Sequence, residues 1–271
     1  MNKKKDRKIL KNFFYVLLFA VVVYALYFGA IKLFDIVSKS DKIIIKNIEI
    51  VGVKNVTKAE IKELLPFKTG DNLLKVKLSE AESEIKKLKL ELKNITIRRR
   101  WQKIKIKLYE RTPEAFVMQN GEVMGIDFDD KPFPLRGFMS NMKVPQIICK
   151  NTKERKRLLD FIKNFKCICG DFLKNITEIK LNSTDDIVFV TADNATVFWG
   201  EDMPKNMVNK FKKFKKVYDS SISRYKQIEY INMELYFSGR IIVKPASCDM
   251  GGINSVFDAN DSNINKGFKN V

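Results

Sequence analysis

Histidine is absent from this chain of 271 residues. Ser-His-Asp or Cys-His nucleophile activation, histidine-bound zinc and an imidazole acid–base group all need a ring nitrogen that the chain lacks. Cysteine is scarce, and four residues without Cys-x-x-Cys spacing indicate neither a disulfide scaffold nor a zinc ribbon. We expect buried free thiols at Cys149, Cys167, Cys169 and Cys248. One disulfide among these four residues is the alternative, and the sequence does not select a pair. The sequence argues against a conventional hydrolase, and we predict no catalytic residue, metal or cofactor.

Acidic residues are also in deficit. The chain has 51 lysines and arginines against 32 aspartates and glutamates, which gives a net charge of +19. Such an excess occurs in proteins that bind nucleic acid or membranes, and on lysine-rich surfaces, so its placement matters more than its size. Residues 1–11 are strongly basic, with Asp6 as their one acid. The remaining positive charge is scattered over the chain, which argues against a single nucleic-acid groove.

Charge is missing altogether from residues 12–31, NFFYVLLFAVVVYALYFGAI. A helix of this length is about 30 Å long, the thickness of a bilayer's hydrocarbon core. We therefore predict a transmembrane helix over residues 12–32, since a cleaved signal peptide usually has a shorter apolar region. The basic segment 1–11 places the N-terminus in the cytoplasm and residues 32–271 outside it. This orientation argues against nucleic acid as a partner.

The first part of the chain beyond this helix predicts a small α+β unit. Residues 43–53 alternate apolar and polar side chains and are typical of a strand. Capping boxes beginning at Thr57 and Ser79 predict two helices. Two more strands follow, near residues 95–97 and 104–108. The order strand–helix–helix–strand–strand predicts a half-buried sheet with helices on one face.

The second part predicts helices on an antiparallel sheet. Asn120-Gly121 is a strong hairpin signal between its first two strands. The expected strands are 115–118, 121–126, 176–181, 187–191, 195–199, 228–237 and 240–244, and the expected helices are 153–165 and 205–218. Beyond Ala246 the chain is rich in Asp, Asn, Ser and Gly, so we expect residues 246–271 to be disordered.

Several motifs accompany this order of elements. In the first part they are Ile48-x-Ile50-x-Gly52 followed by Thr57, Gly70-Asp71-Asn72-Leu73, Arg99-Arg100-Trp101 and Glu110-Arg111-Thr112-Pro113-Glu114-Ala115. Together they resemble the POTRA domain of the FtsQ/DivIB cell-division proteins, and the last is similar to that family's Glu-Arg-x-Pro-x-Ala signature. Gln102 and Asp130 depart from the family's usual proline and turn glycine, but aspartate tolerates a left-handed backbone. Trp199-Gly200 and Tyr236-Phe237-Ser238-Gly239 are similar to the family's second, β domain.

The resemblance implies an α+β protein with a POTRA domain at 43–112 and a β domain with an antiparallel sheet at 113–245. It implies a non-enzymatic scaffold in the bacterial inner membrane, expected at the division septum. In the family, the last strands of the β domain receive a strand from the partner FtsB/DivIC, in complex with FtsL. Periodicity alone favours an ordinary internal strand at residues 240–244. On the basis of the resemblance, the predicted partner-binding residues are Tyr236, Phe237, Ser238, Gly239, Ile241 and Val243.

Three charged clusters have structural interpretations that we prefer. The run Arg98–Trp101 could bind phosphate, anionic lipid or nucleic acid, or contact a protein near the membrane. We expect instead arginines in solvent and a tryptophan covering the core edge. The lysines of helix 205–218 could bind lipid or an anionic polymer, but a solvated helix face is the simpler interpretation. A calcium loop would need further ligands, so we expect a turn at Asp127, Asp129 and Asp130.

Two other classes of protein remain as alternatives to the division scaffold. One is a POTRA-containing translocation or envelope-assembly chaperone, although such proteins usually carry several POTRA units and a membrane barrel. The other is a membrane-tethered enzyme that acts on cell-wall polymer. The missing histidine, and the lack of a nucleophile motif or metal-ligand spacing, argue against the enzyme.

Overall fold

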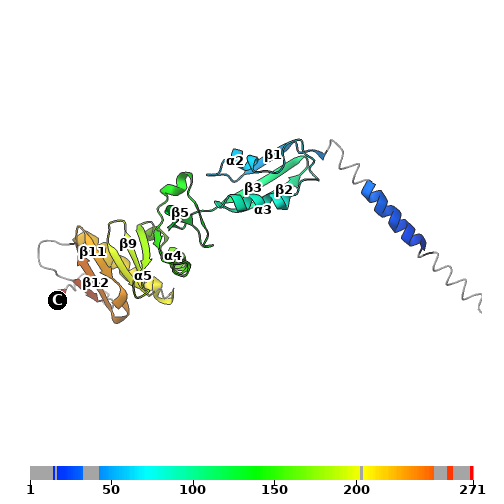
Figure 1. Ribbon diagram of the computed structural model, residues 1–271. Coiled ribbons are helices and arrows are strands. Elements are labelled where there is room, and N and C mark those ends of the chain that lie inside the picture. The colour runs from blue at the N-terminus through cyan, green and yellow to red at the C-terminus, as the bar shows by residue number, and fades with distance from the viewer. Residues whose placement is uncertain are drawn as a thin grey trace, which may run out of the picture. The chain divides into compact units, whose positions relative to one another are not determined.

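The computed structural model describes residue 15 and residues 17–32, 43–201, 204–246, 255–258 and 269–270. The chain forms two compact units, and the boundary between them lies between Glu110 and Arg111. Figure 1 labels several of their helices and strands. Each unit has its own cluster of buried apolar side chains, so each is organised around a separate core.

The predicted membrane helix is described only in part. Residues 17–32 are helical and their side chains are exposed. Residues 12–14 and 16 lie outside the described residues, together with the basic segment 1–11. Among the residues that are described, no helix has both the length and the apolar character that crossing a membrane requires.

The first unit has the predicted order of elements around a three-stranded sheet. Strand β3 is central, with β1 parallel to it on one side and β2 antiparallel on the other. Its core joins alternate sheet residues, such as Ile104 and Ile106, to one face of each helix, through Ile61 and Ile85. The elements are β1 (Asn47–Val51), α2 (Lys58–Glu63), α3 (Leu78–Leu88), β2 (Leu92–Arg100) and β3 (Lys103–Glu110).

One of the two predicted capping boxes is confirmed. The Thr57 hydroxyl accepts the Glu60 N–H at 3.2 Å and caps α2. The second prediction is wrong, because α3 begins at Leu78, one residue before Ser79, with no side-chain cap. Glu82, the expected partner of Ser79, instead accepts the N–H of Ile97 on β2. A bond to the neighbouring strand has replaced the local one.

The second unit contains one long sheet, two long helices and short 3-10 turns. Its strands lie in the order β14-β13-β12-β11-β10-β9-β8-β7-β4-β5-β6. The elements are β4 (Ala115–Gln119), β5 (Glu122–Ile126), β6 (Pro132–Pro134), η2 (Gly137–Asn141), β7 (Gln146–Ile148), α4 (Thr152–Leu173), β8 (Ile176–Leu181), β9 (Ile187–Thr191), β10 (Thr196–Gly200), α5 (Pro204–Arg224), β11 (Ile228–Asn232), η3 (Glu234–Ser238), β12 (Arg240–Pro245), β13 (Ser255–Asp258) and β14 (Lys269–Asn270).

This sheet is mixed, which corrects the expectation of an antiparallel one. Strand β10 is parallel to β11, and β7 is parallel to both β4 and β8. Helix α5 connects β10 to β11, and helix α4 connects β7 to β8. A helix between two neighbouring strands carries the chain back to the end where the first strand began, so the second runs parallel to it.

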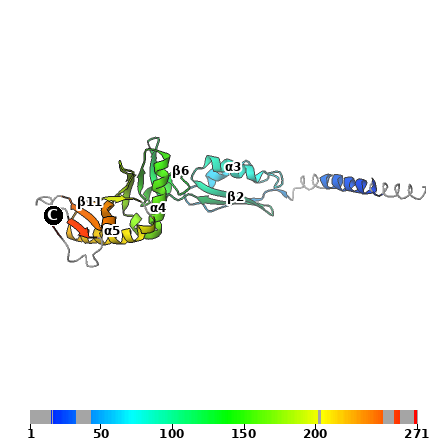
Figure 2. The same cartoon turned by 90° about the horizontal axis from the view of Figure 1, so that it is seen from below.

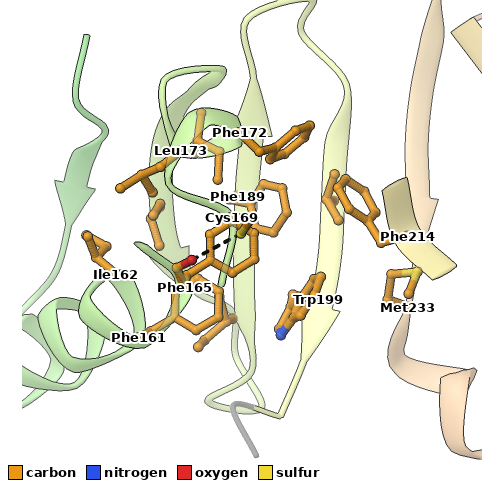
Figure 3. Close-up of a cluster of buried hydrophobic side chains, with 14 of the residues drawn as sticks. Phe161, Ile162, Phe165, Cys169, Phe172, Leu173, Phe189, Trp199, Phe214 and Met233 are labelled. Atoms are coloured by element: carbon orange, nitrogen blue, oxygen red, sulfur yellow. Dashed lines mark hydrogen bonds between the residues drawn. The ribbon is translucent and has the colours of Figure 1, made fainter. Parts of the chain in front are cut away.

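The core of the second unit is rich in aromatic side chains. Figure 3 shows Phe161, Phe165 and Phe172 of α4 against Phe189 and Trp199 of the sheet. The rings of Phe165 and Trp199 meet edge to face, with centroids 5.5 Å apart. Figure 2 shows the same unit turned, with α4 and α5 labelled. Both helices contribute to one continuous cluster, and this arrangement fixes the positions of β10, β11 and β12.

Strand β11 is shorter than the predicted strand 228–237. It ends at Asn232, and η3 follows at Glu234–Ser238. The Asn232 side-chain oxygen accepts the N–H of Glu234 at 2.8 Å, which is the hydrogen bond of an Asx turn. This local bond ends the strand even though apolar residues continue beyond it.

The tail differs from the expected disorder where it is described. Residues 255–258 form β13, which pairs antiparallel with β12, and residues 269–270 form β14, which pairs with β13. A strand at the edge of a sheet offers unpaired N–H and C=O groups that any extended segment can satisfy. Polar composition alone did not reveal this pairing because the bonds involve the backbone.

Candidate partner-binding edge

Strand β12 is held on its two sides in different ways. Strand β11 pairs with one side of β12, and its residue Ile231 is fully buried in the core. The other side pairs with β13, and the register runs from Arg240 opposite Asp258 to Val243 opposite Ser255. The chain therefore places a segment of its own tail on the side of β12 that faces away from β11.

The six predicted partner-binding residues separate into a turn and a strand. Phe237 and Ser238 of η3 are exposed, and Tyr236 is half-buried against the core. Gly239 ends η3 in the left-handed conformation, with φ of +77°. The side chains on the strand, Ile241 and Val243, are 1% and 0% exposed and belong to the core. A partner could reach Ile241 and Val243 only through their backbone.

An exposed apolar residue of the turn was missed by the sequence analysis. Leu235 is 41% exposed and lies two residues before Phe237, which is 54% exposed. Both precede β12 directly along the chain. The apolar pattern of residues 228–237 predicts one continuous strand, whereas the strand ends at Asn232 and the exposed turn follows it.

A cavity of about 270 Å³ lies beside η3 with a buried lysine in its wall. The cavity is lined by Asp186, Gly200, Glu201, Lys210, Glu234 and Phe237. Lys210 is 3% exposed, and its ammonium lies 4.9 Å from the Trp199 ring and 5.7 Å from the Phe237 ring. The expectation that the lysines of this helix are solvated is wrong for Lys210. It shares a 3–4 spacing with buried Met207 and Phe214, a signal that was present in the sequence.

The pKa of Lys210 is lowered to about 8, because burial disfavours the charged form more than the nearby carboxylates favour it. Below pH 8 the lysine is charged in both states, and between pH 8 and 10.5 only the unfolded chain keeps the proton. The stability contribution of Lys210 therefore rises with pH across that window. We expect Lys210→Met to stabilise the second unit at pH 7 by about 1–3 kcal/mol, and the gain to shrink towards pH 10.

Urea unfolding at pH 7 and pH 10 measures this difference. Lys212→Met is the matched control, since Lys212 lies on the same helix but is exposed, and its effect should be small at both pH values. A loss of stability in Lys210→Met at both pH values would mean that the aromatic rings hold the ammonium more strongly than burial penalises it.

The Glu-Arg signature has structural roles on both sides of the boundary between units. The Glu110 carboxylate accepts the N–H groups of Lys54 at 2.6 Å and of Val56 at 3.2 Å, which fixes the loop before α2. Burial opposes ionisation of Glu110, but these bonds outweigh it and lower the pKa of the carboxyl. Arg111 is buried and donates to the buried Asp127 carboxylate.

The acidic turn is built from ion pairs of the second unit. Arg111 reaches Asp127 and, at 3.4 Å, Asp129, while Asp130 pairs with Arg155 at 2.7 Å. Asp130 has φ of +55°, so aspartate takes the left-handed position that a glycine commonly fills. In the part of the chain that the structure describes, no group of three or more acidic or cysteine side chains could hold a metal ion.

The arginine run at the end of β2 is only partly as expected. Arg98 and Arg100 are exposed, whereas the Arg99 guanidinium donates to the carbonyl oxygens of Leu73, at 2.9 Å, and Val76. Trp101 is 78% exposed, so the expectation that it covers the core edge is wrong. The next residue of the turn, Gln102, has a left-handed backbone with φ of +54°.

Three cysteines are free thiols in the structure, and Cys248 lies outside the described residues. Cys169 is buried, Cys149 is half-buried and Cys167 is exposed, so burial holds fully only for Cys169. The Cys169 thiol lies 3.1 Å from the carbonyl oxygen of Phe165, and burial raises its pKa to about 12. A thiol with such a pKa is unreactive at neutral pH.

Two models of known protein families match most of the chain. The FtsQ-type POTRA domain matches residues 44–111, and the C-terminal domain of the cell division protein FtsQ/DivIB matches residues 108–234. No match is found among curated proteins. The chain belongs to the FtsQ/DivIB family, and this membership implies a role in cell division within a family of non-catalytic proteins. Most of η3 and all of β12 lie beyond the matched range.

Proposed function

We propose that this protein is a membrane-anchored scaffold of the bacterial division machinery that recruits a partner by strand addition at β12. The partner is an FtsB/DivIC-like protein in complex with an FtsL-like protein. One observation carries the proposal: the outer edge of β12 already accepts an antiparallel strand, β13, over four residues. An edge that pairs with the chain's own tail has the geometry to pair with a strand from another chain.

In this mechanism the backbone and the side chains have separate tasks. Ile241 and Val243 point into the core, so β12 supplies affinity through its N–H and C=O groups. Specificity then comes from side chains that remain accessible beside it, Leu235 and Phe237 of the turn. Strand β13 pairs over only four residues, and so short a segment is readily replaced by a longer partner strand.

Membrane attachment completes the proposal. Support comes from the uncharged run 12–31, of which residues 17–31 lie in the described helix, and from the basic segment 1–11 before it. A helix over 12–32 would confine the protein to two dimensions, with the POTRA domain at 43–112 and the β domain at 113–245 outside the cytoplasm. Both units would then meet partners on the outer side of that membrane.

A fluorescent fusion to the full chain tests the division role in living cells. We expect the fusion to gather at midcell in dividing cells, and depletion of the protein to produce filaments that fail to septate. A fusion carrying residues 1–42 alone is the matched control, and it should spread evenly over the envelope because it lacks both units. Uniform staining by the full chain, with normal division after depletion, would contradict the proposal.

A further inference from the structure

The turn between β2 and β3 projects an aromatic side chain into solvent. Trp101 is 78% exposed, the highest exposure of any large apolar side chain that the structure describes. It is one of two tryptophans in the protein, and the other, Trp199, is fully buried. An indole is costly to leave in water, and it favours places where one side is apolar and the other is wet.

Backbone pairing fixes this turn at one particular end of the POTRA unit. The carbonyl oxygen of Gln102 accepts the N–H of Lys46 at 2.8 Å and that of Asn47 at 3.4 Å. Strand β1 begins at Asn47 and runs parallel to β3, which begins at Lys103. Trp101 therefore lies where the chain enters the unit. Residues 33–42 separate this end from the N-terminal helix, a distance of about 35 Å at most.

The sheet face that leads to Trp101 is basic. Residues that alternate with the buried Ile97, Ile104 and Ile106 lie on the face opposite the helices. The basic side chains at these positions are Arg98, Arg100, Lys103, Lys105 and Lys107.

These charges are opposed to one another across the hairpin. Arg100 is directly opposite Lys103, and Arg98 is directly opposite Lys105. Like charges at such positions destabilise a sheet. Lys105 forms an ion pair with Glu49, with the ammonium and carboxylate 3.2 Å apart. No described residue forms an ion pair with Arg98, Arg100 or Lys103. The hairpin thus presents unneutralised positive charge together with an exposed indole.

We propose that this hairpin face binds the anionic headgroup region of the bilayer, with Trp101 inserted at the interface. The inference rests on the proposed membrane anchoring, which keeps the hairpin within reach of the surface. Tryptophan is enriched at the level of the headgroups, and basic side chains are attracted to anionic lipid. Contact at this end would hold the POTRA unit against the membrane.

Tryptophan fluorescence of the full chain in lipid nanodiscs tests this contact. Trp101→Phe gives the emission of buried Trp199 alone, and its difference from the unmodified chain gives the Trp101 emission. In discs of anionic phosphatidylglycerol we expect the Trp101 emission to shift to the blue and to be quenched by brominated acyl chains. In discs of zwitterionic phosphatidylcholine we expect both effects to be much weaker.

Charge variants separate this contact from simple proximity to the disc. Arg100→Gln with Lys103→Gln should largely abolish the quenching. The matched control, Lys86→Gln with Lys87→Gln, removes the same charge from the exposed side of α3 and should leave the quenching unchanged.

The result that overturns the inference is a chain retained in the anionic disc with unquenched Trp101. Protection of Trp101 only on addition of an acidic protein would also overturn it, in favour of a protein contact. If the chain is not retained in discs, the proposed anchoring fails instead. Quenching by added anionic vesicles with brominated chains then decides whether the hairpin binds lipid.

Discussion

Replacing Arg111 with methionine is expected to cost the second unit about 3–5 kcal/mol of unfolding free energy. Arg111 and Asp127 are each 5% exposed, and the guanidinium donates directly to the carboxylate. Methionine keeps an apolar side chain in place but removes the cation. The Asp127 carboxylate then stays buried without its main counter-charge, and that uncompensated charge accounts for most of the loss.

Urea unfolding followed by the fluorescence of Trp199, in a Trp101→Phe background, measures this cost. The matched control is Arg155→Met, which breaks the pair with Asp130 at 2.7 Å. The Arg155 and Asp130 side chains are each about one fifth exposed, so water can replace part of the interaction. The loss of unfolding free energy in Arg155→Met should therefore be nearer about 1 kcal/mol.

A double variant isolates the buried charge as the cause. Arg111→Met combined with Asp127→Leu removes both charges, and it should recover more than half of the stability that Arg111→Met loses. If Arg111→Met costs no more than Arg155→Met, the buried pair is not what holds the acidic turn in place.

Features that depend on neighbouring residues were predictable from the sequence. Thr57 caps α2 as its capping box indicated. The Asn120-Gly121 dipeptide forms the hairpin turn, with φ of +51° and +83°. Asp130 takes the left-handed position. In each case the residue type determines the local backbone, so a motif of two to four residues carries the information.

Features that depend on distant residues were not predictable in this way. The parallel pairing of β10 with β11 is set by where α5 returns the chain, and strand periodicity is the same for either direction. The tail strand β13 pairs through its backbone, which composition does not report. Glu82 left its expected cap for the N–H of Ile97, a bond across fifteen residues of sequence.

The partner-binding segment stays a prediction, but the burial of its individual side chains was not predictable from the sequence. The family resemblance directed attention to residues 236–243, yet Ile241 and Val243 proved to be core residues. A charged substitution at Ile241 would disrupt the core itself, because that side chain is 1% exposed, so it cannot test partner binding. Strand addition at β12 therefore has to be tested by blocking the backbone groups of its outer edge.

A disulfide staple between β12 and β13 should abolish capture of the FtsB/DivIC-like partner. Ile242 and Val256 are directly opposite each other in the register. Opposite residues of antiparallel strands have Cα atoms about 4.5–5.5 Å apart, which a disulfide can bridge. Ile242 is half-buried on β12, so cysteine there spares the core residues Ile241 and Val243. Oxidation of Ile242→Cys with Val256→Cys would lock the tail on the edge and exclude any other strand.

Three controls accompany the staple. Cys167→Ser and Cys248→Ser remove an exposed thiol and the thiol nearest the edge in sequence from the background. The single variant Ile242→Cys should capture the partner with or without oxidant. A chain ending at residue 246 lacks the competing strand altogether, so it should bind the partner more tightly than the full chain.

Binding of the purified partner to the stapled chain, before and after addition of reductant, tests the central claim most directly. The claim is that the outer edge of β12 is where the partner strand docks. It predicts that the oxidised chain shows no capture and that reduction restores capture to the level of the unmodified chain. Equal capture by the oxidised and the reduced chain would place the partner elsewhere and contradict the claim.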